Sequence, residues 1–200
     1  MAAAEGDRDH IPPRNIFPTD VSGNLITVPT HKSCNNGLSI FDETFRAFIL
    51  GGCYDNARAK ELQQTVVKKS HTGPIGQRKR DYLLSKVRDE VFTDDGELIK
   101  GPLLLIEADN PSFMPQFERI IKGLYYHKLR SPLSPNISLK TSFKDISELN
   151  EIGFNPKWEE VEKDVFRYFL CTQHGDYTNG VVGLLFYEKL FCVGFFSEQE

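Results

Sequence analysis

The 200-residue sequence predicts an α+β protein, with a small N-terminal module, connecting helices and a C-terminal body of mostly antiparallel strands with one long helix. Apolar residues recur at helical spacing before residue 70 and again before residue 130, whereas β-branched and aromatic runs dominate after residue 136. The length suits one domain or two small ones. Within that length, the changes of pattern along the chain predict a small module over 1–55, a basic helical connector over 56–90 and an α+β body over 91–200.

The N-terminal module should contain a strand followed by a helix. The run Asn24-Leu25-Ile26-Thr27-Val28 is rich in β-branched residues and is bounded by Ser-Gly and Pro, which is typical of a strand. Ser39 can cap the following helix, and Gly51-Gly52 should end it. The expected apolar face of that helix repeats over Phe41, Phe45, Phe48 and Ile49.

A second helical stretch is expected over about 56–69, and a β-hairpin with an Asp-Gly turn over 90–99. A long helix should open near Asp109 and run to about Leu129, with its apolar face on one side. The remaining apolar runs predict four strands, which cover 137–143, 165–171, 181–187 and 190–196.

Composition excludes several classes of protein. The longest apolar run, 181–187, is far shorter than the roughly 20 residues of a spanning helix, so no membrane partner is expected. The first ten residues carry charges and no apolar core, unlike a secretory signal. Four widely separated cysteines then suggest reduced thiols and a cytoplasmic protein.

Charge is distributed unevenly around a net value of −4. The stretch from Arg58 to Arg88 holds nine basic residues against two acidic ones, whereas residues 141–200 hold five against eleven. Such asymmetry either marks a nucleic-acid face or is merely solvated surface. The candidate nucleic-acid contacts are Lys68, Lys69, Arg78, Lys79 and Arg80. The acidic C-terminal body is better suited to folding or to a protein partner.

One spacing pattern points to chemistry. Asp9-His10 is followed after fourteen positions by Asn24, and Asn35 comes eleven positions later. Hydrolysis of a phosphodiester with one metal needs a neutral imidazole as base, a metal that stabilises developing charge, and a group that orients the imidazole. A His at a strand end, an Asn across a hairpin and ligands opening the next helix can supply all three.

These segments resemble the HNH endonuclease family, which has a ββα-metal finger. The similarity lies in Asp-His-Ile-Pro-Pro from residue 9, Asn-Leu-Ile-Thr-Val-Pro from residue 24 and Cys-Asn-Asn from residue 34. More narrowly, Asp-Glu-Thr-Phe-Arg from residue 42 resembles a bacterial HNH-like group. The resemblance implies a metal-dependent endonuclease that hydrolyses DNA phosphodiester bonds.

The resemblance also implies roles for single residues. His10 matches the general base, Asn24 the residue that positions it, and Asp9 and Asn35 the ligands of a divalent metal, Mg²⁺ or Mn²⁺. The further candidate metal ligands are His31, Cys34 and Asp42.

The sequence departs from the family in its zinc ligands. His31-x-x-Cys34 is a usable half-site, but residues 1–8 contain no Cys or His that could complete it, so we expect no structural zinc. Two other functions stay open. The chain is either a decayed HNH-like module that binds nucleic acid or a protein partner, or a structural α+β protein whose Phe-rich terminal hairpin binds a partner.

Overall fold

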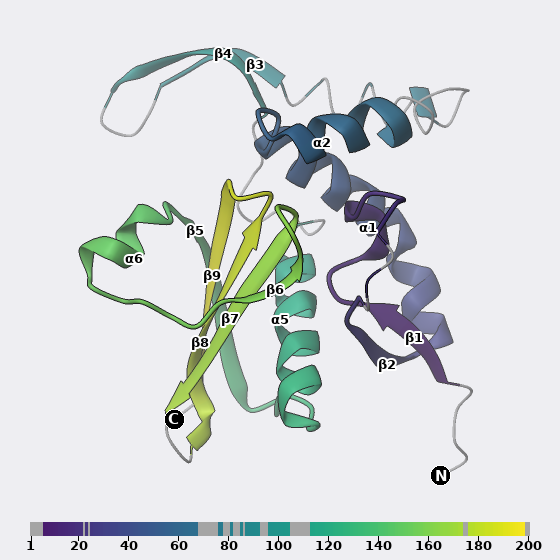
Figure 1. Ribbon diagram of the computed structural model, residues 1–200, viewed down its shortest axis with the longest axis vertical. Helices are drawn as coiled ribbons and strands as arrows, with labels where there is room; N and C mark the ends of the chain where they lie inside the picture. Colours follow the sequence, from purple (N-terminus) through teal and green to yellow (C-terminus); the bar gives the residue numbers. More distant parts are fainter. Residues whose placement is uncertain are drawn as a thin grey trace.

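The computed structural model describes residues 6–21, 23, 25–67, 76–77, 81, 85, 87–92, 96–104, 113–173 and 176–198, and for residues 33–40, 66–67, 87, 91–92, 99 and 101–104 it describes the backbone alone. The described elements mix helices with antiparallel strands, which confirms the α+β prediction (Figure 1). None of the described helices is long and apolar enough to span a membrane.

The described strands form three antiparallel sheets. Two are hairpins, β1 (Gly6–His10) with β2 (Thr27–His31) and β3 (Val87–Phe92) with β4 (Leu98–Leu104). The third has the order β5-β9-β8-β7-β6, with bounds Ile137–Lys144, Leu190–Glu198, Asp176–Phe186, Phe166–Gln173 and Glu159–Glu162. The helices are α1 (Lys32–Gly52), α2 (Ala57–Leu62) continued by a π-helical turn (Gln63–Val67), α5 (Met114–Leu129) and α6 (Ser147–Glu151), with a 3-10 turn at Arg14–Ile16.

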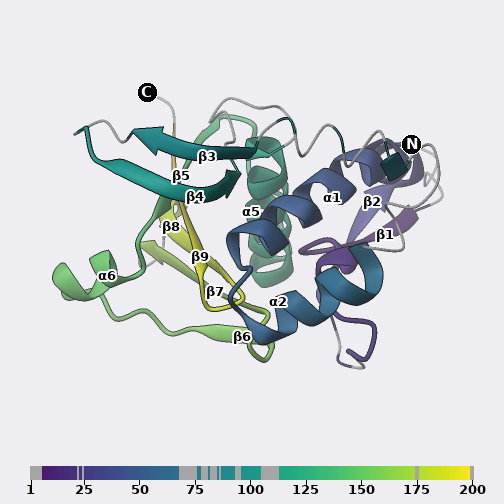
Figure 2. The ribbon, with the colours of Figure 1, turned by 90° about the horizontal axis from the view of Figure 1, so that it is seen from above.

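The N-terminal module is a ββα unit, which we call the finger (β1, the following loop, β2 and α1). Its register places Asp9 opposite Val28 and His10 opposite Thr27, at the end of β1. The chain passes from β2 directly into α1, which runs from the hairpin toward the large sheet (Figure 2).

The expected helix start at Ser39 was wrong, because α1 begins at Lys32. Asn35, Asn36 and Gly37 are poor helix formers and suggested a turn. Such propensities are weak against the packing of a whole helix, and α1 buries Phe45 and Ile49 completely in the core. Phe41, expected on the same apolar face, is 37% exposed.

Helix α5 packs against both the large sheet and the finger. Ile121 lies so close to Gly194 of β9 that an added Cβ there would be 2.5 Å from the Ile121 Cδ1 atom. On the finger side, an added Cβ at Gly123 would be 2.6 Å from the Ile11 Cγ1 atom. Both glycines therefore permit the close approach of α5 to its neighbours, and Ile11 follows His10 directly in the chain.

One hydrophobic core joins the finger to the sheet. It contains residues of the finger loop, α1, α2, α5 and the strands, among them Ile11, Ile16, Phe17, Phe45, Leu62, Phe117, Leu124, Phe166, Leu184 and Phe186. A second cluster lies on the other side of the sheet beside α6, and includes Trp158, Phe169 and Phe191. The sequence did not predict α6 or β6, whereas β5, β7, β8 and β9 confirm the four expected strands.

Candidate functional site

The site is organised by an arginine that the sequence analysis did not single out. Arg119 of α5 makes two hydrogen bonds through Nη2 to Asp9 Oδ1 (2.5 Å) and Oδ2 (2.6 Å), and a third through Nε to Oδ2 (2.8 Å). Its Nη1 donates to Asp42 Oδ1 (2.7 Å) and to Gln116 Oε1 (2.9 Å). A single guanidinium thus joins β1, α1 and α5.

These charges are largely removed from solvent. The side chains of Arg119, Asp9 and Asp42 are 13%, 10% and 20% exposed. Burial raises the pKa of Asp42 above its ordinary value, and the charge and hydrogen bond of Arg119 oppose this only in part. Burial alone would lower the pKa of Arg119, but the hydrogen bonds and charges of Asp9 and Asp42 raise it overall. Arg119 is therefore permanently cationic.

His10 lies beside this ion pair in a pocket of about 280 Å³, which we call the His10 pocket. Its imidazole is half-buried, and among the described residues nothing forms a hydrogen bond with it. The other lining residues are Arg8, Asp9, Pro13, Arg14, Asn15, Asp42 and Glu43. Basic and acidic groups therefore surround an imidazole that remains available to a ligand.

Asn15 fixes the loop after β1 to α1. Its Nδ2 donates to the backbone oxygen of Asp42 at 3.0 Å, and its buried Oδ1 has no partner within the described part of the chain. The loop that follows His10 is consequently held against the helix that carries Asp42.

Asp9 also lines a larger groove of about 490 Å³ between β2 and α5, which we call the β2–α5 groove. Its walls are mostly apolar and include Ile11, Val28 and Tyr126, and its charged residues include Glu118, Arg119 and Lys122. Glu118 and Lys122 pair with each other at 3.4 Å. Asp9 therefore separates the His10 pocket from a second, more apolar hollow.

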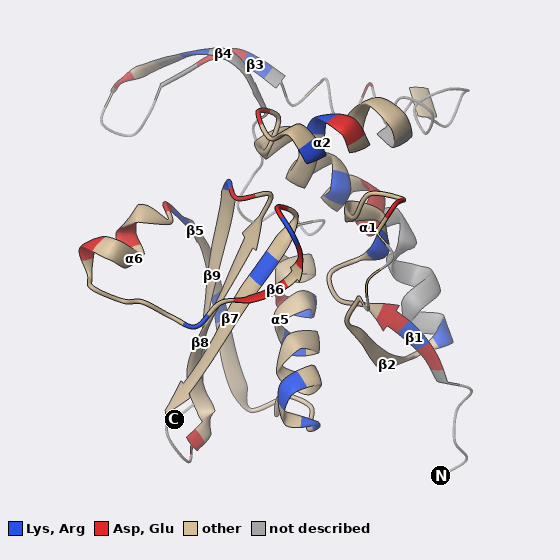
Figure 3. Ribbon diagram, in the orientation of Figure 1, with Lys and Arg blue, Asp and Glu red and all other residues tan. Residues whose placement is uncertain are grey.

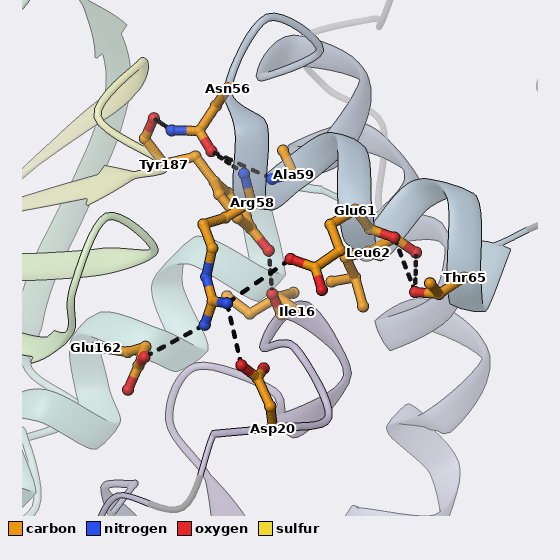
Figure 4. Close-up of polar contacts among 10 residues, drawn as sticks. All are labelled: Ile16, Asp20, Asn56, Arg58, Ala59, Glu61, Leu62, Thr65, Glu162 and Tyr187. Atoms are coloured by element: carbon orange, nitrogen blue, oxygen red, sulfur yellow. Dashed lines mark hydrogen bonds and ion pairs between the residues drawn. The ribbon is translucent and has the colours of Figure 1, made fainter.

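A second polar junction binds the finger loop to α2 and the sheet (Figure 4). Arg58 contacts Asp20 of the loop at 3.1 Å and Glu162 of β6 at 3.6 Å, and Asn56 caps α2. The hydroxyl of Tyr187 donates to the Ile16 oxygen at 2.5 Å. Arg58 begins the basic stretch, but carboxylates already surround its charge.

The structure brings some of the expected site residues together. Asp9, His10 and Asp42 share the His10 pocket. His31 pairs with Gly6 at the other end of the hairpin, four residue pairs from His10, or about 13 Å at the usual rise of a strand. Asn24, the side chains of Cys34 and Asn35, and the residues Lys68, Lys69, Arg78, Lys79 and Arg80 lie outside what the structure describes.

The described residues do not by themselves fit a divalent metal site. Within them, no three His, Cys, Asp or Glu side chains are grouped in a way that could hold an ion. Asp9, the implied ligand, has both carboxylate oxygens bound by Arg119. The Mg²⁺ or Mn²⁺ site stays a prediction, and so does the absence of a structural zinc.

Gln116, Arg119 and Asn15 were missed for an identifiable reason. Gln116 and Arg119 are three positions apart, so they lie on one face of α5 among the apolar Phe117 and Ile120. That polar pair was a usable signal for a buried contact. The partner carboxylates lie 110 and 77 positions away, and no local pattern in the sequence names them.

Comparison with protein-family models, with curated proteins and with solved structures gives no match. The HNH resemblance therefore stays a hypothesis based on the motifs between Asp9 and Arg46.

Proposed function

We propose that the chain is an HNH-type endonuclease that hydrolyses DNA phosphodiester bonds at the His10 pocket. The observation that carries the proposal is the ββα unit, in which the end of β1 presents Asp9 and His10 beside Asp42 of α1. The motif spacing predicts His10 at the end of a strand, which supports the proposal, while Asn24 and the side chain of Asn35 lie outside the described residues.

In this proposal, His10 accepts a proton from the attacking water, because it lines the pocket and its imidazole has no hydrogen bond among the described residues. Arg8 and Arg14 line the same pocket and provide positive charge for a phosphate. Asn15 and Asp42 hold the loop and helix on either side of His10. A bound divalent ion would supply further stabilisation of negative charge on the phosphate.

The Asp9–Arg119 ion pair favours a second candidate. In a decayed HNH-like module, Arg119 would take over the structural role of a cation at Asp9, and the finger would bind nucleic acid or a protein partner without cleaving it. The two candidates differ in whether purified protein cleaves DNA when Mg²⁺ or Mn²⁺ is added.

Plasmid cleavage with Mg²⁺ or Mn²⁺ tests the proposal directly. His10→Ala should lower the cleavage rate by about 10²- to 10⁴-fold, because that is the usual contribution of a general base. His127→Ala is the matched control, since His127 is on α5 and does not line the His10 pocket. Equal rates for wild type and His10→Ala would refute the assignment. DNA binding without cleavage by the wild type would favour the decayed module.

The proposed DNA path includes the basic stretch after α2. Replacing Arg78, Lys79 and Arg80 by Glu should weaken DNA binding and flatten its dependence on salt, because fewer counterions are released. A control with the same change of charge replaces the exposed Lys140, Lys157 and Lys163 of the C-terminal body. The proposal fails for this stretch if filter binding across a salt series shows equal affinities and slopes for the two triple variants.

A further inference from the structure

We propose that the β2–α5 groove binds an unpaired nucleobase of the DNA strand whose phosphate occupies the His10 pocket. This inference rests on the proposed function and narrows its substrate to a strand with an unpaired nucleotide at the site. It begins from the two hollows, which share Asp9 and differ in the charge and polarity of their walls.

The His10 pocket is suited to an anion. Arg8 and Arg14 line it, and Arg14 Nη1 donates to two backbone oxygens of the following loop at 3.1 and 3.2 Å. These neutral acceptors fix the guanidinium without cancelling its charge. The carboxylates of the same pocket are instead paired with cations, Asp9 and Asp42 with Arg119 and Glu43 with Arg46. The charge left over is positive, as a phosphate requires.

The β2–α5 groove is suited to a flat, uncharged group. Its four charged lining residues form two ion pairs, Asp9 with Arg119 and Glu118 with Lys122, so their formal charges cancel. Its other walls are mostly apolar, and its volume of about 490 Å³ is within the roughly 300–1,000 Å³ of small-ligand sites.

Tyr126 is the one aromatic residue of that lining, and it is half-buried on α5. Nucleobases stack on aromatic side chains, and this contact tolerates any base. Carboxylate oxygens such as those of Glu118 can accept hydrogen bonds from the amino groups of bases. The groove therefore offers both a stacking surface and polar acceptors.

An extended peptide fits the groove less well. Pro29 lies within β2 and lines the groove, and proline has no N–H to donate to an added strand. Recognition of a nucleobase requires no backbone donor from β2.

A nucleotide combines the two properties, an anionic phosphate and a flat base. Because the two hollows meet at Asp9, a phosphate beside His10 and a base beside Tyr126 can belong to one strand. A base in a duplex is paired and stacked, and its extraction costs free energy that an unpaired base does not require. The site should consequently bind single strands in preference to an intact duplex.

Binding of a single-stranded DNA oligonucleotide with a central 2-aminopurine tests the proposal in EDTA, where binding is measured without cleavage. Tyr126→Ala should weaken binding by about 5- to 150-fold and remove the change in 2-aminopurine fluorescence, because it removes the stacking surface. Tyr126→Phe keeps the ring and should retain both. Tyr54→Ala is the matched control, since Tyr54 is 68% exposed and does not line the groove. Circular dichroism checks that each variant is folded.

Equal binding and fluorescence for wild type and Tyr126→Ala would overturn the inference, and so would equal affinity for the single strand and its duplex. If wild type still cleaves plasmid with Mg²⁺ or Mn²⁺, the proposed nuclease site survives that result. If the strand binds through Tyr126 and nothing is cleaved, the inference holds for the decayed module. If no DNA binds and Tyr126→Ala dissociates a dimer seen by sedimentation, the groove binds a second copy of the chain and the inference fails.

Discussion

The two polar junctions between the finger and the rest of the molecule use the same chemistry in different surroundings. At each, an arginine contacts carboxylates from separate segments, Arg119 with Asp9 and Asp42, and Arg58 with Asp20 and Glu162. The Arg119 side chain is 13% exposed, whereas Arg58 is 29% exposed and its partner Asp20 is 61% exposed. The side chains of the first junction are largely buried and belong to the candidate site, whereas those of the second junction are more exposed to solvent.

This difference in burial determines how much each ion pair contributes to the stability of the fold. A solvent-exposed pair contributes little to stability because water and salt screen it, whereas removing one partner of a buried pair leaves a charge without compensation. The exposed junction depends on its uncharged members instead. The Tyr187 hydroxyl donates to the backbone oxygen of Ile16, and Asn56 Nδ2 donates to the backbone oxygen of Tyr187 at 2.8 Å.

The charges of the body are also distributed unevenly. In Figure 3 basic residues recur along α5, while acidic residues gather around α6 and β6.

The largest expected effect comes from breaking each arginine junction in turn. Arg119→Gln should lower the free energy of unfolding by about 3–5 kcal/mol, because it leaves Asp9 and Asp42 buried beside each other without a cation. Arg58→Gln should lower it by about 0–1 kcal/mol. Urea unfolding of both variants and wild type at one pH measures the difference. Similar losses for the two variants would show that burial does not distinguish the junctions.

A smaller effect is expected from the packing beside the Arg119 junction. Gly123→Ala should destabilise the protein by about 1–3 kcal/mol, since the new Cβ would lie 2.6 Å from the Ile11 side chain. Gly52→Ala is the control, because its nearest neighbour outside the helix is 3.7 Å away and alanine favours a helix. Thermal unfolding should show a lower midpoint for the first and an unchanged or higher one for the second.

The smallest expected effect is a pH dependence at Asp42. Its pKa is raised above the ordinary 3.8, so the folded protein binds the proton more tightly than the unfolded chain does. The stability of wild type relative to Asp42→Asn should be greatest below pH 3.8 and should fall as the pH rises through the raised pKa. Urea unfolding of the pair across this range measures the trend. A relative stability that rises with pH would mean that Arg119 outweighs burial at this junction.

Local patterns predicted much of the fold. Aromatic and β-branched runs located β5, β7, β8 and β9, and helical spacing located α5 and the buried Phe45 and Ile49. Short polar segments were harder. Glu159–Glu162 has little strand propensity, and forms β6 because it pairs with β7. The predicted start of α1 was too late, because the low helix propensity of Asn35, Asn36 and Gly37 indicated a turn. In the structure, burial of Phe45 and Ile49 further along α1 stabilises the whole helix.

The candidate site was predictable only where it is local in sequence. Asp9 and His10 are adjacent, and the motif placed them at a strand end, where the structure has them. Arg119 could not be paired with Asp9 from sequence, because their contact depends on how α5 packs against β1. The partners of Arg58 could not be predicted from sequence either. In the sequence it is one of nine basic residues between 58 and 88, whereas in the structure it contacts Asp20 and Glu162.

The hydrogen bond from Tyr187 to Ile16 spans 171 positions, and it has a consequence for the order of events on the ribosome. The finger is synthesised before the hairpin of β8 and β9 that holds its loop, so the two can meet only after the residues between them have been translated. Closing a loop of such long sequence separation has a high entropic cost, which slows folding. A nascent finger would therefore lack this anchor until the hairpin of β8 and β9 has been synthesised.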